Sequence, residues 1–376
     1  MGGSVDQSAD EGRGRRQEFL KDIKALRRDL VESLSADDLE HLRRIERWGR
    51  ASAAAGYLTA WVAPNPVSAG LLGLASSTRW LMMHHIAHRG YDKVPGVPER
   101  YTSRRFARGW RRATDWLDWI DPEAWALEHN TLHHAHTGEE ADPDLLERNL
   151  EFLRTSTAPT WQRVVALGIL AASWRLLYYA PSTLRVLQDQ RDGVQGQGEH
   201  RAPKLADFFD LRVPRVRELW RRCLLPQGLA RFVVIPALYL PLGPWAAFSV
   251  QVNTLMAEVV TNVHTFLVVA PNHTGDDLWR FDDPPQDQAE FFVRQVLGSA
   301  NYRTGGDLND FAHLWLNYQV EHHIWPALPM SAYQRAQPRL KALCEAHGVP
   351  YVQQSVWRRI GKMVDVCVGR SSMRRG

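Results

Sequence analysis

The sequence has little cysteine and no paired cysteine motif. Its 376 residues include Cys223, Cys344 and Cys367, which lie far apart in the chain. Neither a disulfide framework nor a thiolate zinc site is therefore expected, because both need cysteines in pairs or at short spacing. The first 20 residues are charged and contain no apolar stretch, so a cleaved secretory signal is not expected either.

Long apolar runs are also scarce in the first half of the chain. Residues 51–63 and 67–83 are each shorter than the ~20 residues that a spanning helix needs. The Pro-Asn-Pro sequence at 64–66 between them predicts a turn, so the two segments are expected to form a tight helical hairpin.

A second apolar pair is clearer. Residues 229–242 and 245–270 are apolar and are separated by Gly243 and Pro244, which predicts a second hairpin. Residues 164–180 are apolar but contain Arg175. Because a charge inside a bilayer is costly, we expect this segment to be interrupted there and to be interfacial or re-entrant rather than spanning.

Positive charge is concentrated beside these apolar segments. The net charge is only +4, but arginine-rich runs occur at 100–112, 212–222 and 370–375. Nucleic acid is one partner for such runs. Their position favours cytoplasmic flanks of membrane helices instead, by the positive-inside rule, and no nucleic-acid partner is expected.

The chain is therefore expected to be an all-α, polytopic membrane protein with two transmembrane hairpins and a cytosolic helical cap. Apolar positions in residues 19–48 predict two amphipathic helices, the second capped by Ser35 ahead of Asp38. Residues 1–15 are expected to be disordered and 193–198 to form a flexible loop. The expected regions are a charged N-terminal helical region at 1–47, a membrane domain at 48–351 and a basic C-terminal tail at 352–376.

Ten of the fifteen histidines lie in short clusters or at the ends of the hairpins. His84 and His88 are spaced to share one face of a helix, and so are His129 and His133. A third cluster is the NYQVEHHIWP stretch, in which Gln319 precedes two histidines. The histidine clusters are HHIAH at 84–88, HNTLHHAH at 129–136 and QVEHH at 319–323, with His273 after the second hairpin.

Clusters of this kind suit a transition metal. Imidazole nitrogen favours iron, zinc, copper or nickel over magnesium or calcium. Seven or more nitrogens exceed the shell of one ion, so two metal ions are the simplest interpretation. A single histidine pair would more often be accidental, but three clusters with short spacings at one membrane edge favour a metal site.

These motifs resemble the three histidine boxes of the membrane fatty acid desaturase superfamily, HxxxH, HxxxHH and QxxHH. The ADPD run after the second box and the ANYRTG stretch at Ala300 match as well, and the resemblance extends from about Trp48 to about Tyr351. It implies two iron ions on the cytosolic face, which use O2 and two electrons to introduce a double bond into an acyl chain. The glutamine of the third box resembles the front-end subgroup and several bacterial acyl desaturases.

The resemblance also implies the ligands. His85 is an alternative to His84, but the spacing of the first box favours His84. His273 stands where related desaturases place a further ligand after the last spanning helix. The implied metal ligands are His84, His88, His129, His133, His134, His273, Gln319, His322 and His323.

Other polar residues near the boxes are candidates for supporting roles. Asn262 and His264, with Glu258, would form a polar cluster within the second hairpin, either as hydrogen-bond partners of ligands or in a substrate tunnel. His313 is a candidate support for the third box. Carboxylates near the boxes are expected to bind the outer ring nitrogens of ligands rather than the metals. These are Asp142, Asp144 and Glu321.

Two alternatives remain at this stage. A hydroxylase or ketolase would use the same metals, and a non-catalytic membrane metal protein would use similar ligands. The expected partners are a fatty acyl substrate and membrane lipids. No HPGG haem signature occurs, so electrons are expected from a separate ferredoxin or cytochrome b5-like donor with its NAD(P)H reductase. The expected location is a bacterial inner membrane, with the active site on the cytoplasmic face.

Overall fold

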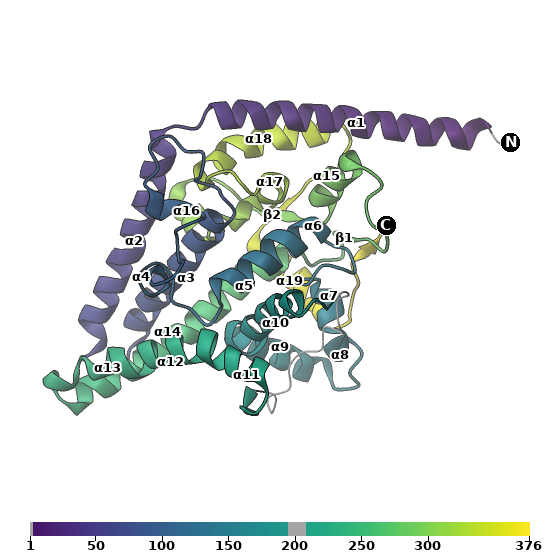
Figure 1. Cartoon of the computed structure of the whole chain (residues 1–376). Helices are drawn as coiled ribbons and strands as arrows, with labels where there is room; N and C mark the ends of the chain where they lie inside the picture. The colour runs from purple at the N-terminus through teal and green to yellow at the C-terminus, as the bar shows by residue number, and fades with distance from the viewer. Residues whose placement is uncertain (1–2, 195–207) are drawn as a thin grey trace.

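The computed structural model describes residues 3–194 and 208–376, and these are mostly helical (Figure 1). The loop predicted at 193–198 lies largely outside the described residues. Strands occur in the described part only as two short parallel pairs, β1 with β4 and β2 with β3. The prediction of a helical protein is therefore confirmed.

Two long helices form the N-terminal region. They are α1 (Gly3–Glu32) and α2 (Ala36–Ala60). Ser35 caps α2: its side chain accepts a hydrogen bond from the backbone of Asp37, and the Asp38 carboxylate accepts one from the backbone of Ser35. The predicted cap is confirmed. The disorder expected for residues 1–15 is wrong from Gly3 onward, because α1 begins there.

A tight helical hairpin follows, made of α2 and α3 (Pro66–Ala87). The Asn65 side chain accepts a hydrogen bond from the backbone N–H of Ser68 at 2.8 Å, and Pro66 occupies the first turn. The helices approach closely at Gly56, where a Cβ atom would lie 2.8 Å from the side chain of Leu72. The predicted turn between the two apolar segments is confirmed.

Three helical runs are long and apolar enough to cross a membrane in the part of the chain that the structure describes. They are Thr160–Arg191, Pro214–Leu242 and Pro244–Asn272. The second and third correspond to the second predicted hairpin, which turns at Gly243 in a left-handed conformation (φ 108°). Neither α2 nor α3 is among these three runs.

The first of these runs stays helical through Arg175, but α9 (Thr160–Trp174) gives way there to the π-helical turn η3 (Arg175–Tyr179). The run's interfacial or re-entrant position stays a prediction. Arg175 is fully buried and forms ion pairs with Asp118 and, at 3.5 Å, with Glu258. Its backbone N–H donates to the side chain of Asn262 on the neighbouring helix α14 (Pro244–Val269). Protein partners therefore compensate the charge that was expected to end the apolar segment.

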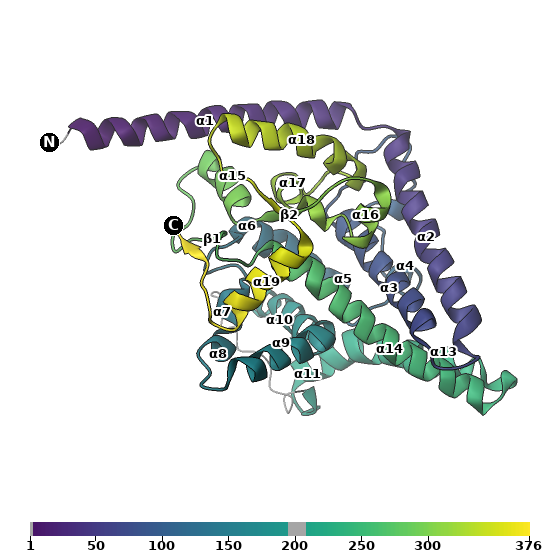
Figure 2. The same cartoon turned by 180° about the vertical axis from the view of Figure 1, so that it is seen from behind.

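The remaining elements include the segments of the long runs and the shorter helices and strands between them. From behind, α14 runs diagonally from α13 towards α19 (Figure 2). In chain order the remaining elements are η1 (Glu99–Tyr101), α4 (Arg111–Asp115), α5 (Pro122–Leu127), η2 (Glu128–His133), α6 (His134–His136), α7 (Leu146–Asn149), α8 (Glu151–Arg154), α9 (Thr160–Trp174), η3 (Arg175–Tyr179), α10 (Ala180–Arg191), α11 (Pro214–Leu219), η5 (Trp220–Leu224), α12 (Leu225–Leu229), η6 (Ala230–Val234), α13 (Ile235–Ala237), η7 (Leu240–Leu242), η8 (Ala270–Asn272), β1 (Trp279–Arg280), α15 (Gln288–Leu297), β2 (Ala300–Tyr302), α16 (Asp307–Ala312), η9 (Leu316–Tyr318), α17 (Gln319–Ile324), α18 (Met330–Ala346), β3 (Val352–Gln354), α19 (Val356–Cys367) and β4 (Arg374–Arg375).

The C-terminal segment at 352–376, expected as a basic tail, packs against the body. Strand β3 pairs with β2, whose Asn301 side chain accepts from the backbone N–H of Val320 in the third box, and β4 pairs with β1. Arg359 on α19 is fully buried and donates to the carbonyls of Pro271 and Thr274 beside His273. The C-terminal residues therefore help to position the segments that carry histidines.

Candidate metal centre

The three histidine boxes and His273 come from four separate segments and meet in one buried region. His84 and His88 lie at the C-terminal end of α3, and the third box forms α17. The second box does not form the regular α-helix that the spacing argument assumed. Residues Glu128–His133 form a π-helical turn, in which the N–H of His134 bonds the carbonyl of His129. Such turns are frequent at functional sites.

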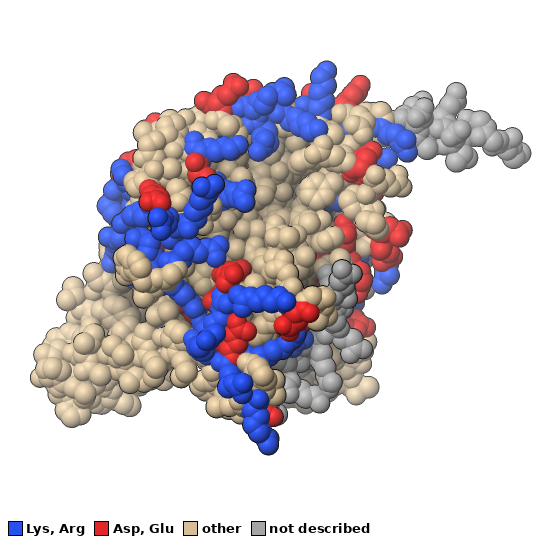
Figure 3. Space-filling view, viewed as in Figure 1, with Lys and Arg blue, Asp and Glu red and all other residues tan. Residues whose placement is uncertain are grey.

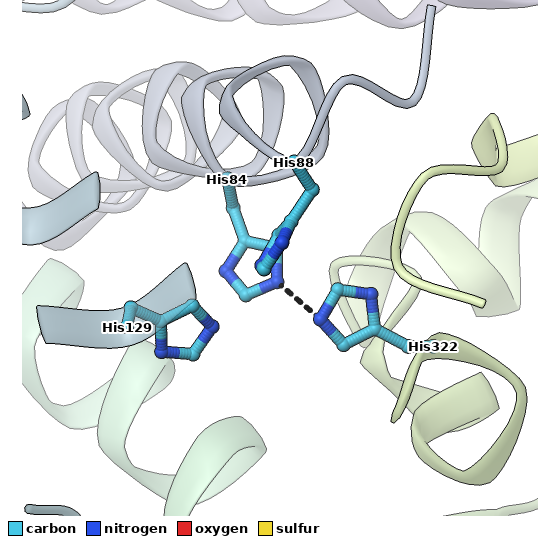
Figure 4. A group of neighbouring side chains, drawn as sticks. All are labelled: His84, His88, His129 and His322. Atoms are coloured by element: carbon cyan, nitrogen blue, oxygen red, sulfur yellow. Dashed lines mark hydrogen bonds between the residues drawn. The ribbon is translucent and has the colours of Figure 1, made fainter. Parts of the chain in front are cut away.

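The first group comprises four buried histidines (Figure 4). They are His84, His88, His129 and His322, and each offers a ring nitrogen within 4.8 Å of the others. The Nε2 atoms of His84 and His322 lie 3.0 Å apart, although 237 residues separate the two in the chain. This group therefore brings the first, second and third boxes together.

The second group comprises His133, His273 and His323, whose ring nitrogens also lie within 4.8 Å of one another. The Nε2 atoms of His273 and His323 are 3.1 Å apart. Gln319 lies beside them, and its amide N–H donates to Nε2 of His273 at 2.8 Å. His134 lies between the two groups, since its ring centre is 4.5 Å from that of His88 and 4.4 Å from that of His323.

In four of these rings the Nδ1 atom, which points away from the centre of the group, has a hydrogen-bond partner in the protein. Nδ1 of His133 donates to the carboxylate of Asp142 at 2.8 Å, and Nδ1 of His273 donates to the carbonyl of Gly298 at 3.2 Å. Both acceptors lack a proton to give, so each Nε2 keeps its lone pair. At His273 that lone pair accepts from the Gln319 amide, which a metal ion would displace.

The two histidines of the third box follow the same pattern. Nδ1 of His323 donates to the amide oxygen of Gln295 at 3.0 Å and lies 3.1 Å from the hydroxyl of Thr137. Nδ1 of His322 lies 3.2 Å from the hydroxyl of Tyr333, which itself donates to backbone carbonyls. Gln295, Thr137 and Tyr333 were missed by the sequence reasoning, because no motif spacing connects them to the boxes.

The chemistry of these side chains fits metal ions. Both ring nitrogens of His129 and of His134 are buried without a hydrogen-bond partner, as is Nδ1 of His84. A buried nitrogen without a hydrogen-bond partner lowers the stability of the fold unless it binds a ligand such as a metal ion. Two ligands that bind one ion at ~2.1 Å and at right angles lie ~3.0 Å apart, which is close to the 3.0 and 3.1 Å separations found in the two groups.

The protonation of the rings also suits a cation. Burial, reinforced by the neighbouring imidazoles, holds the pKa of four rings well below the usual value: His129, His134, His322 and His323. Neutral rings can bind a metal without first losing a proton. Burial opposes ionisation of Asp142, but His133 and the backbone N–H groups of Gly138 and Asp144 outweigh it and lower the pKa of Asp142.

The three carboxylates near the boxes have different positions. Asp142 bonds a ring nitrogen, as expected. Asp144 lies 3.8 Å from Nδ1 of His129 and lines the adjoining cavity. Glu321 is contrary to expectation, because its carboxylate bonds no histidine and instead accepts from Asn301 and Tyr351. Burial raises the pKa of Glu321 to about 7 despite those two donors.

Several other predicted site residues lie away from the histidine groups. His264 contacts Ser77 and the carbonyl of Ala312, and it belongs to neither group. Asn262 bonds Arg175 and Glu258 and does not line the cavity beside the histidines. Neither residue is therefore placed to orient a ligand or to line that cavity.

His313 and His85 are also directed elsewhere. Nδ1 of His313 lies 2.8 Å from the carbonyl of Asn309, and its ring packs against Tyr302. His85 is buried, with Nε2 3.5 Å from the carbonyl of Leu314, and it is absent from both groups, whereas His84 is part of the first. The geometry therefore favours His84 over His85.

A largely apolar cavity, partly open to solvent, adjoins both groups. His84 and His129 of the first group line it, as do His133 and His273 of the second. The rest of its wall is largely apolar and comes from α7, α9, α14 and neighbouring segments. The apolar and aromatic lining residues are Trp80, Leu146, Leu150, Leu170, Trp174, Tyr178, Tyr179, Phe266, Val269, Ala270 and Leu316.

A comparison with protein families decides the identity of this site. The model of the fatty acid desaturase family matches residues 55–355. The chain belongs to the fatty acid desaturase family. It is thus an oxidoreductase of that family, and the resemblance inferred from the three boxes is confirmed.

Curated relatives agree with this assignment. The desaturase is 26% identical to the NADPH-dependent stearoyl-CoA 9-desaturase of Mycobacterium tuberculosis over 373 aligned residues, which cover 92% of this chain and 79% of that one. It is 24% identical to the Delta(5) fatty acid desaturase A of Dictyostelium discoideum, over 72% of this chain and 55% of that one. The relatives' names thus place their double bonds at different positions.

Proposed function

We propose that this desaturase introduces a double bond into a fatty acyl chain bound in the cavity beside the histidines, using two iron ions and O2. One observation carries the proposal: the same apolar cavity touches both histidine groups. A featureless hydrocarbon chain has no polar group near its reacting carbons, so a close-fitting apolar wall must position it.

The proposed first iron is held by His84, His88, His129 and His322. The second is held by His133, His273 and His323 with Gln319 beside them, and His134 lies between the two. When bound, iron supplies the O2-dependent removal of hydrogen from an unactivated C–H bond, which side-chain acids and bases cannot achieve.

The protein's own part in this reaction is positional. Asp142, Gly298, Gln295 and Tyr333 hold the outer nitrogens of four rings, so their Nε2 atoms face inward. The apolar wall keeps water away from the histidines and holds the chain against them. Desaturation rather than hydroxylation is proposed because the relatives are named as desaturases.

The electron donor is proposed to be a separate protein, a ferredoxin or a cytochrome b5-like carrier with its NAD(P)H reductase. The relative from Mycobacterium tuberculosis is named as NADPH-dependent, which supports this source of electrons. We propose that the site faces the cytoplasm in a bacterial inner membrane, since the arginine-rich runs at 100–112 and 212–222 fit the positive-inside rule.

The test is expression in a desaturase-deficient host, followed by mass spectrometry of total lipids. Wild-type protein is expected to produce a new double bond, and the His322→Ala, His323→Ala double variant none. His347→Ala is the matched control, because His347 bonds Asp22 far from the site. A product heavier by one oxygen would assign a hydroxylase instead, and purified protein without iron would refute the metal centre.

A further inference from the structure

A second cavity lies on the other side of α3, between α2, α3, residues 113–117 and the run from α12 to α13. Arg79 of α3 and Arg231 of η6 line it, together with the polar side chains of Tyr57, Ser76 and Gln227. It shares no lining residue with the cavity beside the histidines in the described part of the chain. The reaction proposed above does not use it.

The charges around this cavity are not balanced. Among the residues that the structure describes, Arg231 forms an ion pair only with Glu258, at 3.5 Å, and its buried Nε and Nη2 atoms have no hydrogen-bond partner. Glu258 is shared with the buried Arg175, which also pairs with Asp118. Arg79 makes no hydrogen bond or ion pair within the described residues. Three guanidinium groups thus stand against two carboxylates, so the cavity has unmatched positive charge.

Nearby carboxylates do not supply the missing charge. Asp115 follows the lining residue Ala113 closely, but it is bonded by Arg111 at 2.8 and 2.9 Å. Glu46 is bonded by Arg50 and Arg100. The unmatched charge of the cavity therefore remains available to an external anion, and guanidinium groups bind phosphate oxygens strongly.

The position of the two arginines identifies the source of that anion. Residues 51–78 and 232–257 contain no Asp, Glu, Lys or Arg; Arg79 directly follows the first stretch and Arg231 directly precedes the second. The stretches form an apolar lobe, which appears uncharged at the lower left of Figure 3. Its surface exposes Leu58, Val67 and Leu238 by 68% to 73%. Such a surface suits contact with lipid acyl chains. Arg79 and Arg231, at its edge, would then lie at the boundary between the hydrocarbon region and the lipid headgroups.

We propose that this second cavity binds the phosphate headgroup of an anionic phospholipid, whose acyl chains lie along the apolar lobe. Arg79 and Arg231 contact the phosphate, and Ser76 and Gln227 offer further donors. Because the site has no residue in common with the histidine cavity, this lipid is a bound partner of the fold rather than the acyl substrate. The proposal does not depend on the desaturase reaction.

Native mass spectrometry of the purified protein in a neutral detergent tests this proposal. Phosphatidylglycerol is titrated into wild type, and phosphatidylcholine and inorganic phosphate are titrated in parallel. We expect one phosphatidylglycerol to bind selectively, and Arg79→Gln to weaken its binding by about tenfold, the effect of losing a charge-assisted hydrogen bond. Arg79 has no partner within the described residues, so this variant should fold normally.

Arg104→Gln is the matched control, because Arg104 is also exposed and also makes no hydrogen bond or ion pair within residues 3–194 and 208–376. It should bind phosphatidylglycerol within twofold of wild type. Arg231→Gln should weaken binding as Arg79→Gln does. Equal binding by wild type and Arg79→Gln, equal losses in Arg79→Gln and Arg104→Gln, or equal affinity for phosphatidylcholine would overturn the proposal. So would inorganic phosphate binding as tightly as the lipid.

Discussion

Replacing Asp142 with asparagine is expected to weaken iron binding by about 10- to 100-fold, the usual effect of losing the outer partner of a ligating histidine. Oδ1 of Asp142 accepts from Nδ1 of His133 and from the backbone N–H of Asp144, both at 2.8 Å, while Oδ2 accepts from the N–H of Gly138 at 3.0 Å. Asparagine has only one oxygen, so its NH2 group must face a donor on one side.

The size of this effect follows from those contacts. A hydrogen bond to a charged group contributes about 1.5–3 kcal/mol, and each ~1.4 kcal/mol changes a binding constant tenfold. If the amide oxygen stays on His133, the NH2 group faces the N–H of Gly138; if the amide turns over, His133 loses its acceptor. Either arrangement loosens the ring that serves the second histidine group.

Chelator competition measures the prediction directly, with iron counted per folded protein. Asp38→Asn is a matched control, because Asp38 is buried and accepts from Ser35, Ser331 and Arg335 but contacts no histidine ligand. It should lower stability without changing iron affinity in the folded fraction. If Asp142→Asn retained iron as firmly as wild type, Asp142 would not support the metal centre.

Three further predictions concern other parts of the molecule. The Asn301 amide donates to the Glu321 carboxylate on α17 at 2.7 Å. Asn301→Ala removes this hydrogen bond and should lower the iron content while the circular dichroism spectrum stays native; an unchanged iron content would show that α17 is held without Asn301. Arg175→Met leaves the buried Asp118 uncompensated and should destabilise by about 3–5 kcal/mol in thermal unfolding, whereas adding Asp118→Asn should restore part of the loss. Leu170→Trp fills part of the cavity and should shift the product profile to shorter chains at unchanged iron content; an unchanged profile would place the substrate elsewhere.

The histidine groups could be predicted from sequence because many of their members lie at short spacings in the chain. A helical segment is enough to bring His84 and His88 into one group, whereas the adjacent His322 and His323 contribute to different groups. Distant segments with the same chemistry were expected to join them. The N-cap of Ser35 and the turn at Asn65 were predictable for the same reason, since a few adjacent residues determine them.

The features that could not be predicted depend on contacts between residues far apart in the chain. The charge of Arg175 implied a break in an apolar segment, but its two carboxylate partners come from residues 118 and 258, which no local pattern connects to it. Likewise Gln295 reaches His323 from α15 across the fold. Glu321 looked like a partner of the histidines beside it, yet the helical turn of α17 directs its side chain towards Asn301 and Tyr351.

The separation of the ligands along the chain has a consequence for how the enzyme is made. The first group joins His84 to His322, and β3 pairs with β2 beside the third box only through residues 352–354. The three long apolar helical runs are therefore synthesised before either histidine group is complete. On the proposed function, iron loading would follow synthesis of the third box and docking of the C-terminal segment, so a chain truncated before His322 would lack a complete first group.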